Sequence, residues 1–254
     1  MSRYFIEVAY NGFNYSGFQV QENANTIQAE VEKAFATIGR EKIILTGSSR
    51  TDAGVHALQN FFHFDTDKSL HSSFIYKMNA LLPWDIAVIN VYKVGDEAHC
   101  RFDAIGRSYI YKIHKSKDPF KHNRSYYYPY TLDRNAMQKA VEFVKGEHNF
   151  FGFAKSNTQV TNFNCKVEDC NLKEEEGNLE FSIKANRFLR GMVRSLMGSV
   201  LKVGRGNISL AQFKRIFDGE EKCGFSVPGY GLYLMEVEYP ENYFSASALH
   251  FTAF

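Results

Sequence analysis

Arg50-Thr51-Asp52-Ala53-Gly54-Val55-His56-Ala57 places a single carboxylate in a short turn between two apolar segments, and this turn organises the first half of the chain. The flanking segments, 42–46 and 57–64, are rich in β-branched and aromatic residues and are predicted to be strands. The Asp-Ala-Gly step supplies the turn, because Asp bonds its own backbone and Gly accepts a positive φ. Arg50 and Asp52 alternate with Thr51, so their side chains leave the same face of an extended segment. On turn chemistry alone, Asp52 closes a hairpin and does nothing more.

The segments around this turn predict the order βαββαβ for residues 1–104. Alternating apolar residues predict strands, and apolar residues at helical spacing predict helices. The predicted strands are 4–10, 42–46, 57–64 and 86–94, and the predicted helices are 27–38 and 72–82. A capping box formed by Asn25 and Gln28 is expected to start the first helix. This order is that of a ferredoxin-like unit.

The second half, 105–254, repeats the pattern with an extra helix. Its predicted strands are 107–113, 125–130, 165–172, 179–185 and 232–239, with 165–172 and 179–185 joined as a hairpin by the turn 174–178. Its predicted helices are 132–144, capped by Thr131, 188–203, and 210–217, capped by Ser209. No Pro-rich or Ser-rich linker separates the halves, so we expect their antiparallel sheets to join. The sequence therefore predicts an α+β fold of two ferredoxin-like halves with a central active-site cleft between them.

Composition limits the class of protein. The 254 residues suffice for one large domain or two smaller ones. No segment approaches the roughly 18 consecutive apolar residues of a membrane helix, and the N-terminus lacks a signal-peptide pattern, so a soluble cytoplasmic protein is expected. The cysteines are sparse and are expected to be reduced thiols: Cys100, Cys165, Cys170 and Cys223. No spacing indicates a zinc site, and no metal or cofactor is expected.

Charge is distributed unevenly although the net charge is only +2. One basic stretch without acidic residues contains Lys184, Arg187, Arg190, Arg194, Lys202 and Arg205. A second contains Arg101, Arg107, Lys112, Lys115, Lys117, Lys121 and Arg124, with Asp103 and Asp118 among them. Such stretches suit the phosphate backbone of a nucleic acid, and a solvated charged surface is the alternative.

The residues 50–57 resemble, without a gap, the catalytic signature of the TruA family, the tRNA pseudouridine synthases A. Further matching segments follow the family's order along nearly the whole chain: 10–21, 79–83, 101–104, 107–113, 184–188, 192–194 and 231–234. Two positions depart from the pattern. Phe18 stands where the family usually has Trp, and Ser49 stands where it usually has Gly.

The resemblance implies a reaction as well as the two-half fold. Members of the family isomerise uridine to pseudouridine: the N-glycosidic bond breaks, the uracil turns, and its C5 bonds to C1′ of the ribose. The essential acid acts as a nucleophile or as a base, and Asp52 is expected to be that residue. The family modifies positions 38, 39 and 40 in the anticodon arm of tRNA, without a cofactor and as a homodimer.

The resemblance also implies which residues complete the site. Arg194 matches the family residue that pairs with the catalytic Asp, and Tyr109 matches the tyrosine that stacks beneath the flipped uracil. Tyr111 faces the same side of the strand, so the choice between the two tyrosines stays open. Arg50 is a candidate to fill the space that the extruded base leaves, or to hold a phosphate beside it. Further expected substrate-binding residues are Arg101, Arg107, Lys184 and Asn186.

Two other classes of protein compete with this reading. A non-catalytic RNA-binding protein would use Asp52 only as a turn residue, but binding alone does not require Asp52, Tyr109 and Arg194 together. A metal-dependent nuclease would need clustered carboxylates, and the sequence shows no such cluster. His56 is expected to be a hydrogen-bonded structural histidine.

Overall fold

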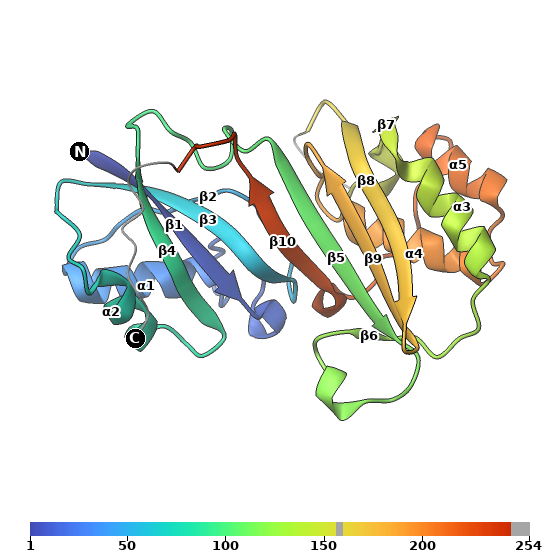
Figure 1. The fold of residues 1–254 in the computed structure, drawn as a ribbon, viewed down its shortest axis with the longest axis horizontal. Helices are drawn as coiled ribbons and strands as arrows, with labels where there is room; N and C mark the ends of the chain where they lie inside the picture. The colour runs from blue at the N-terminus through green and yellow to red at the C-terminus, as the bar shows by residue number, and fades with distance from the viewer. Residues whose placement is uncertain (156–159, 245–254) are drawn as a thin grey trace. The chain divides into compact units, whose positions relative to one another are not determined.

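The computed structural model describes residues 1–155 and 160–244. Two compact units divide the chain: Met1–Ile105 together with the segment from Leu234 onward, and Gly106–Tyr233. Each unit combines antiparallel strands with helices (Figure 1), which confirms the predicted α+β class with two ferredoxin-like halves. The junction of their sheets and the cleft between them stay predictions.

The predicted domain limits, 1–104 and 105–254, need one correction. The chain returns to the first unit at Leu234, because β10 (Leu232–Glu238) is a neighbour of β3 in the sheet. The sequence placed this strand with the second half because it follows the helices of that half along the chain. Residues 245–254, which the same prediction included, lie outside the described residues.

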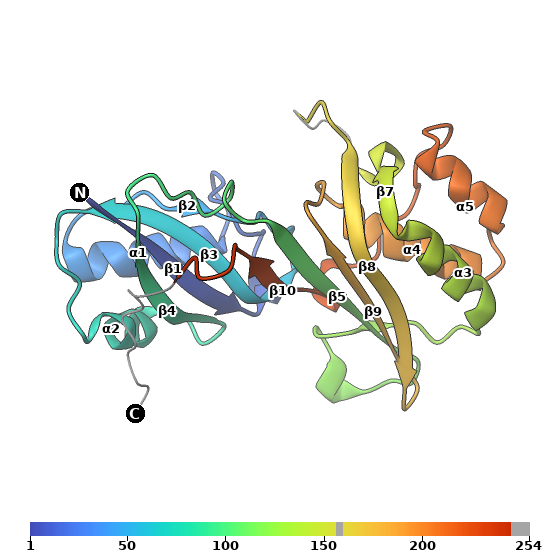
Figure 2. The ribbon, with the colours of Figure 1, turned by 45° about the horizontal axis from the view of Figure 1, so that its top comes forward.

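The first unit has the predicted order βαββαβ. Its elements are β1 (Ser2–Tyr10), α1 (Ile27–Gly39), β2 (Thr46–Gly47), β3 (His56–Thr66), α2 (Phe74–Leu81) and β4 (Ile86–Val94), with a 3-10 turn at Gly12–Asn14. The strands lie in the order β4-β1-β3-β10, and β2 pairs with β3. Phe35 of α1 contacts both Phe64 of β3 and Phe74 of α2. The two helices therefore form one layer that packs against the sheet (Figure 2).

The register of β1 brings three connecting segments to one end of this sheet. Tyr10, the last residue of β1, pairs with Ala57 of β3 on one side and with Ile86 of β4 on the other. The segments that precede Ala57 and Ile86, and the one that follows Tyr10, therefore lie at the same end of the sheet. The turn that contains Asp52 lies in this group of loops.

The second unit is built around a long hairpin. Its elements are β5 (Gly106–His114), β6 (Tyr126–Tyr127), α3 (Arg134–Val144), β7 (Gly146–Asn149), β8 (Asn164–Glu175), β9 (Asn178–Ala185), α4 (Met192–Gly204) and α5 (Leu210–Phe217), with 3-10 turns at Pro119–Lys121, Phe151–Phe153 and Gly229–Gly231. The strands lie in the order β5-β9-β8-β7, and β6 pairs with β5 in parallel.

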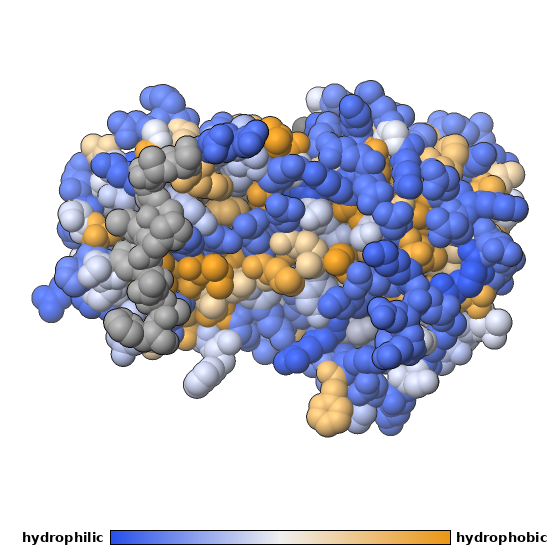
Figure 3. Space-filling model, in the orientation of Figure 1, coloured by the Kyte–Doolittle hydropathy of each residue, from blue (hydrophilic) through white to orange (hydrophobic). Residues whose placement is uncertain are grey.

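One face of this sheet is apolar and the other polar. Buried Leu179, Phe181 and Ile183 alternate along β9 with half-buried polar residues. Figure 3 shows mainly hydrophilic side chains over β8 and β9 on the side that faces the viewer. Helices α3, α4 and α5 contact one another, and α3 contacts β8. The helices therefore enclose the core of this unit against one face of its sheet.

Several element ends differ from the prediction. Thr26 caps α1, one residue after the expected Asn25, and Asp133 caps α3 in place of the expected Thr131. Helix α4 begins at Met192, four residues after the predicted start, and β7 was not predicted. The hairpin turn and the Ser209 cap of α5 are as predicted.

Within the described part of the chain, no helix has both the length and the apolar character needed to cross a membrane. None of the four cysteines is in a disulfide; three are buried and Cys223 is half-buried.

Candidate active site

Asp52 lies in the loop between β2 and β3, as predicted, and its side chain is half-buried. The backbone N–H of Val55 donates to the carbonyl oxygen of Asp52 at 3.2 Å and closes a turn. Gly54 has a φ of 76° in this turn, a conformation that strains other residues. The loop therefore presents Asp52 at the point where the chain reverses into β3.

Buried hydrogen bonds fix the backbone on the N-terminal side of Asp52. The Nδ2 amide of Asn60, in β3, donates to the carbonyl of Ser49 at 2.8 Å and to the hydroxyl of Tyr10 at 3.1 Å. The hydroxyl of Tyr10 also forms a hydrogen bond with Oγ1 of Thr51, 2.8 Å away. Asn60 is fully buried, and the other three residues are at most 8% exposed. Ser49 takes part through its carbonyl, which the Gly usual at this position also provides.

The segment after β1 fixes the loop from the other side. The N–H of Gly12 donates to Nδ1 of His56 at 3.2 Å, and the N–H of Gly54 donates to the carbonyl of Tyr15 at 3.2 Å. A Cβ on Gly12 would lie 1.9 Å from the carbonyl oxygen of Val55, so only glycine fits this approach. His56 is 2% exposed and hydrogen-bonded, as expected of a structural histidine.

Phe18 keeps a packing role at the position where the family usually has Trp. Its ring stacks on Phe62 of β3 with centroids 4.4 Å apart and an interplanar angle of 10°, and it is 1% exposed. Its N–H donates to the carbonyl of Thr51 at 3.1 Å. Phe18 thereby anchors the residue that precedes Asp52 to the core of the first unit.

Two of the predicted substrate-binding residues line one pocket of about 250 Å³ beside this loop. Arg50 and Arg101 are both exposed, and each contributes to the pocket wall. Phe102 and His99 line the same pocket, and sequence reasoning missed both. The structure thus brings together Arg50 and Arg101, which are far apart in the sequence.

In the second unit, the structure distinguishes the two tyrosines of β5. Tyr111 is fully buried, and its hydroxyl donates to the carbonyl of Pro228 at 2.9 Å. Burial raises the pKa of the Tyr111 phenol above its ordinary value. Tyr109 is 9% exposed, and its ring meets Phe188 edge-on, with centroids 4.9 Å apart. Tyr111 therefore has a structural role in the core, which favours Tyr109 for the predicted role at the site.

Arg194 is the third residue of α4 and is half-buried. Its Nε donates to the carbonyl of Val227 at 2.8 Å, and the N–H of Val227 donates to the carbonyl of Arg194 at 3.2 Å. This reciprocal pair fixes the plane of the guanidinium. Such a planar group, held at one edge, suits bidentate binding of a carboxylate through its terminal nitrogens.

The remaining predicted substrate-binding residues have partners within the second unit. Nη1 of Arg107 donates to the carbonyl of Asn186 at 3.5 Å, and Oδ1 of Asn186 accepts from the N–H of Lys166 at 2.9 Å. Lys184 forms an ion pair with Glu168 at 3.4 Å. The acidic residues of β8 thus offset part of the basic stretch that begins at Lys184, and the substrate-binding roles of these residues stay predictions.

Among the described residues, one group of histidines and cysteines has its potential metal-ligating atoms within 4.8 Å of one another: His63, His99 and Cys100. The Nδ1 atoms of both histidines and the Sγ atom of Cys100 have partners within the protein. Nδ1 of His63 accepts from the N–H of Cys100 at 3.3 Å, and Sγ of Cys100 donates to the carbonyl of Thr46 at 3.1 Å. Nδ1 of His99 accepts from the N–H of Arg101 at 3.1 Å. These bonds connect the segment 99–101 to β2 and β3, so the group has a structural role.

Comparison with known proteins agrees with the resemblance seen in the sequence. The family model described as tRNA pseudouridine synthase matches residues 6–103 and 140–240. The tRNA pseudouridine synthase A of Parabacteroides distasonis is 41% identical over 248 residues, covering 96% of this chain and 98% of that protein. That of Bacteroides thetaiotaomicron is 40% identical over 253 residues, covering 96% of this chain and 93% of that protein. A Staphylococcus aureus enzyme of the same name is 35% identical over 245 residues, covering 94% and 93% of the two chains. The chain therefore belongs to the tRNA pseudouridine synthase family, isomerases that convert uridine to pseudouridine.

Proposed function

We propose that this chain isomerises uridine to pseudouridine at positions 38, 39 and 40 in the anticodon arm of tRNA, with Asp52 as the catalytic aspartate. One observation carries the assignment of Asp52. Its loop is fixed by buried hydrogen bonds to Ser49 and Thr51 and by the bond from Gly12 to His56, whereas its side chain is half-buried. A fixed backbone that presents a reachable carboxylate is what positioned catalysis needs.

The reaction makes defined demands on this carboxylate. The bond from C1′ to N1 breaks, the freed uracil turns, C5 bonds to C1′, and the hydrogen on C5 leaves as a proton while N1 gains one. Asp52 acts in its ionised form, either on the nucleoside as a nucleophile or on the ribose as a base. No redox change and no group donor enter this balance, so the proposed reaction uses no cofactor.

Two residues of the second unit join Asp52 in the proposal. Arg194 pairs with the carboxylate and keeps it ionised, a role for which its guanidinium is oriented by Val227. Tyr109 stacks beneath the uracil, which must leave its helix to be reached. The support for Tyr109 is the exclusion of Tyr111, whose hydroxyl is bound in the core.

The proposed substrate contacts follow the basic residues. Arg50 and Arg101 bind the RNA at the pocket of the first unit, and Arg107, Lys184 and Asn186 bind it on the second. We further propose a homodimer that acts on tRNA in the cytoplasm. A dimer doubles the positive surface available to one RNA, which is useful for a chain whose net charge is only +2.

Release of tritium tests the reaction, because the hydrogen on C5 is lost. Anticodon stem-loops with a single [5-³H]uridine at position 38, 39 or 40 are incubated with the purified protein. We expect release from all three and none from a hairpin labelled only at another stem position. A folded protein that binds the hairpins without releasing tritium would instead be a binding protein on this scaffold.

A further inference from the structure

Phe102 is a large apolar residue that is mostly exposed to solvent. It is 75% exposed, and it lines the pocket that also contains Arg50 and Arg101. The ring of His99 lies against it, with centroids 4.2 Å apart. Large exposed aromatic side chains next to cations are typical of surfaces that bind single-stranded nucleic acid.

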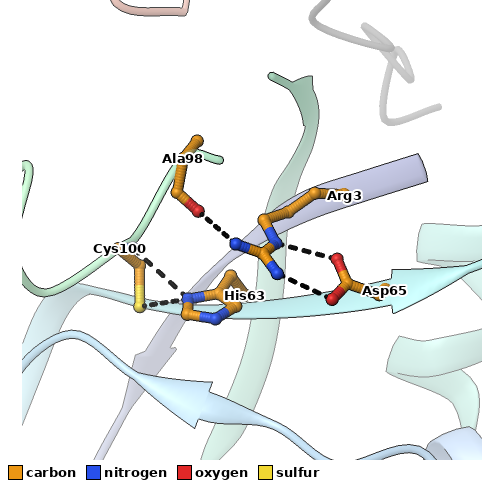
Figure 4. Close-up of polar contacts among 5 residues, drawn as sticks. All are labelled: Arg3, His63, Asp65, Ala98 and Cys100. Carbon is orange, nitrogen blue, oxygen red and sulfur yellow. Dashed lines mark hydrogen bonds and ion pairs between the residues drawn. The ribbon is translucent and has the colours of Figure 1, made fainter. Parts of the chain in front are cut away.

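Two anchors hold the backbone that presents Phe102. Arg3 of β1 binds both carboxylate oxygens of Asp65 at 2.8 Å and donates to the carbonyl of Ala98 at 3.0 Å (Figure 4). Behind the pocket, Nδ1 of His63 accepts from the N–H of Cys100, which is fully buried (Figure 4). The segment 98–102 is therefore tied to β1 and β3, and Phe102 reaches solvent from a fixed position.

A third anchor follows directly in the sequence. The Oδ2 oxygen of Asp103 accepts from the N–H of His99 at 2.8 Å and from the hydroxyl of Tyr243 at 2.5 Å. The exposure of Phe102 thus coincides with dense bonding on both sides of it. A binding residue that is fixed in advance loses little conformational entropy when it engages a ligand.

The chemistry of the pocket matches a single nucleotide. Its wall contains two guanidinium groups and no carboxylate, and an aromatic ring stands at its edge. Guanidinium groups bind phosphate oxygens in bidentate geometry, and aromatic rings stack on bases. Its volume of about 250 Å³ is slightly below the usual range of ligand pockets, so it can hold at most part of one nucleotide unit and not a duplex.

We propose that this pocket is a subsite for one nucleotide of the substrate RNA other than the uridine that reacts: Arg50 and Arg101 bind its phosphate, and its base stacks on Phe102. Asp52 is not among the residues that line the pocket, so the occupant is not the reacting base. The subsite rests on the proposed function, since it takes the substrate to be RNA. It adds a residue, Phe102, that selects for an unpaired nucleotide beside the target.

Hairpin binding by the full chain tests the stacking contact. Phe102→Ala is expected to weaken the Kd for an anticodon stem-loop about ten-fold, and Phe102→Tyr, which keeps the ring, is expected to restore it. Tyr76→Ala is the matched control, because Tyr76 is 77% exposed in the same unit and does not line the pocket. We expect the Kd of this control to equal that of the unmodified protein. Thermal unfolding verifies that each variant is folded.

Abasic substitution identifies the nucleotide. In a series of hairpins that each lack one base near the target uridine, the penalty of Phe102→Ala disappears for one position only. Arg101→Ala lowers the slope of log Kd against log salt by about one. Equal Kd values for Phe102→Ala and the unmodified protein, or a penalty that is the same for every abasic hairpin, would overturn the subsite. Tritium release by the unmodified protein, measured in parallel, shows independently whether the proposed reaction takes place.

Discussion

At the scale of single residues, the proposed catalytic side chains are distinguished from their neighbours by what their polar atoms bind. The hydroxyl of Tyr111 donates to the carbonyl of Pro228 in the core, whereas the ring of Tyr109 meets Phe188 edge-on. Arg194 is bound at Nε by Val227, which orients the guanidinium plane. Sequence spacing alone did not separate the two tyrosines, because both face the same side of β5. The hydrogen bond to Pro228 does.

Replacing Arg194 by Lys tests whether the guanidinium geometry matters. Lys keeps the positive charge but loses both the bond from Nε to Val227 and the capacity for bidentate pairing. We expect kcat for pseudouridine formation to fall on the order of 100-fold, with little change in the urea midpoint of unfolding. Arg215→Lys is the control, because Arg215 lies in α5 and pairs with Glu221. Equal rates for both variants would contradict the pairing role.

At the scale of elements, β3 supports the loop that precedes it through one buried amide. Asn60 joins Ser49 and Tyr10, and through Tyr10 it fixes Thr51. These contacts follow from the register of β1 against β3. The strand therefore stabilises the conformation in which Asp52 is presented.

Asn60→Leu is expected to destabilise this loop. The substitution removes the hydrogen bonds that Asn60 donates to the buried carbonyl of Ser49 and hydroxyl of Tyr10. The free energy of unfolding should therefore fall by about 1–3 kcal/mol. Urea unfolding measures the change, and Leu58→Ala, at an exposed position of the same strand, is the control. An unchanged midpoint for Asn60→Leu would show that the amide does not hold the loop.

The elements that could be predicted are those with a strong local pattern. The helices α1, α2 and α5 have apolar stripes, α5 also has a capping box at Ser209, and the first unit has its predicted order. Strand β7 was missed because Gly146–Asn149 shows no apolar alternation and is defined by pairing with β8. Helix α4 was placed too early because the prediction continued it back through Gly191 to residue 188. Gly191 has a φ of 75°, which is not helical, so the helix begins after it, at Met192.

The candidate site was predictable only in part, for a similar reason. The turn around Asp52 is a local feature, and the sequence Asp-Ala-Gly predicts it. Asn60 gave no signal, and Phe102 entered only as part of the matching segment 101–104, because their importance depends on partners that are distant in the sequence. Asn60 acts through Tyr10, and Phe102 is presented by a segment that Arg3 and His63 anchor.

At the scale of the whole molecule, the stability of the fold should depend on pH through His63. The pKa of His63 is lowered to about 4, chiefly by burial and also by the charges of His99 and Arg3, against an opposing effect of Asp65 and Asp103. In the unfolded chain a histidine titrates near pH 6.5. Between these values the unfolded chain binds a proton that the native protein does not.

The free energy of unfolding is therefore expected to fall as the pH is lowered from about 6.5 to about 4, by on the order of 3 kcal/mol. The stabilisation that comes from the neutral, buried His63 is fully present above the pKa of the unfolded chain, about 6.5, and is lost below the pKa of the folded protein, about 4. Urea unfolding at a series of pH values measures the decline, and His63→Gln removes the titrating group. If the decline over this range is equally steep in His63→Gln, the assignment to His63 is wrong.

The proposed reaction draws on both units of the molecule, but its central claim concerns one carboxylate. The most direct test is tritium release from a [5-³H]uridine anticodon stem-loop by Asp52→Asn, with the Kd for the same hairpin measured alongside. The amide is close in size to the carboxylate but can act neither as nucleophile nor as base. We predict that release falls to the level without enzyme while the Kd stays that of the unmodified protein. Release at the rate of the unmodified protein would contradict the account.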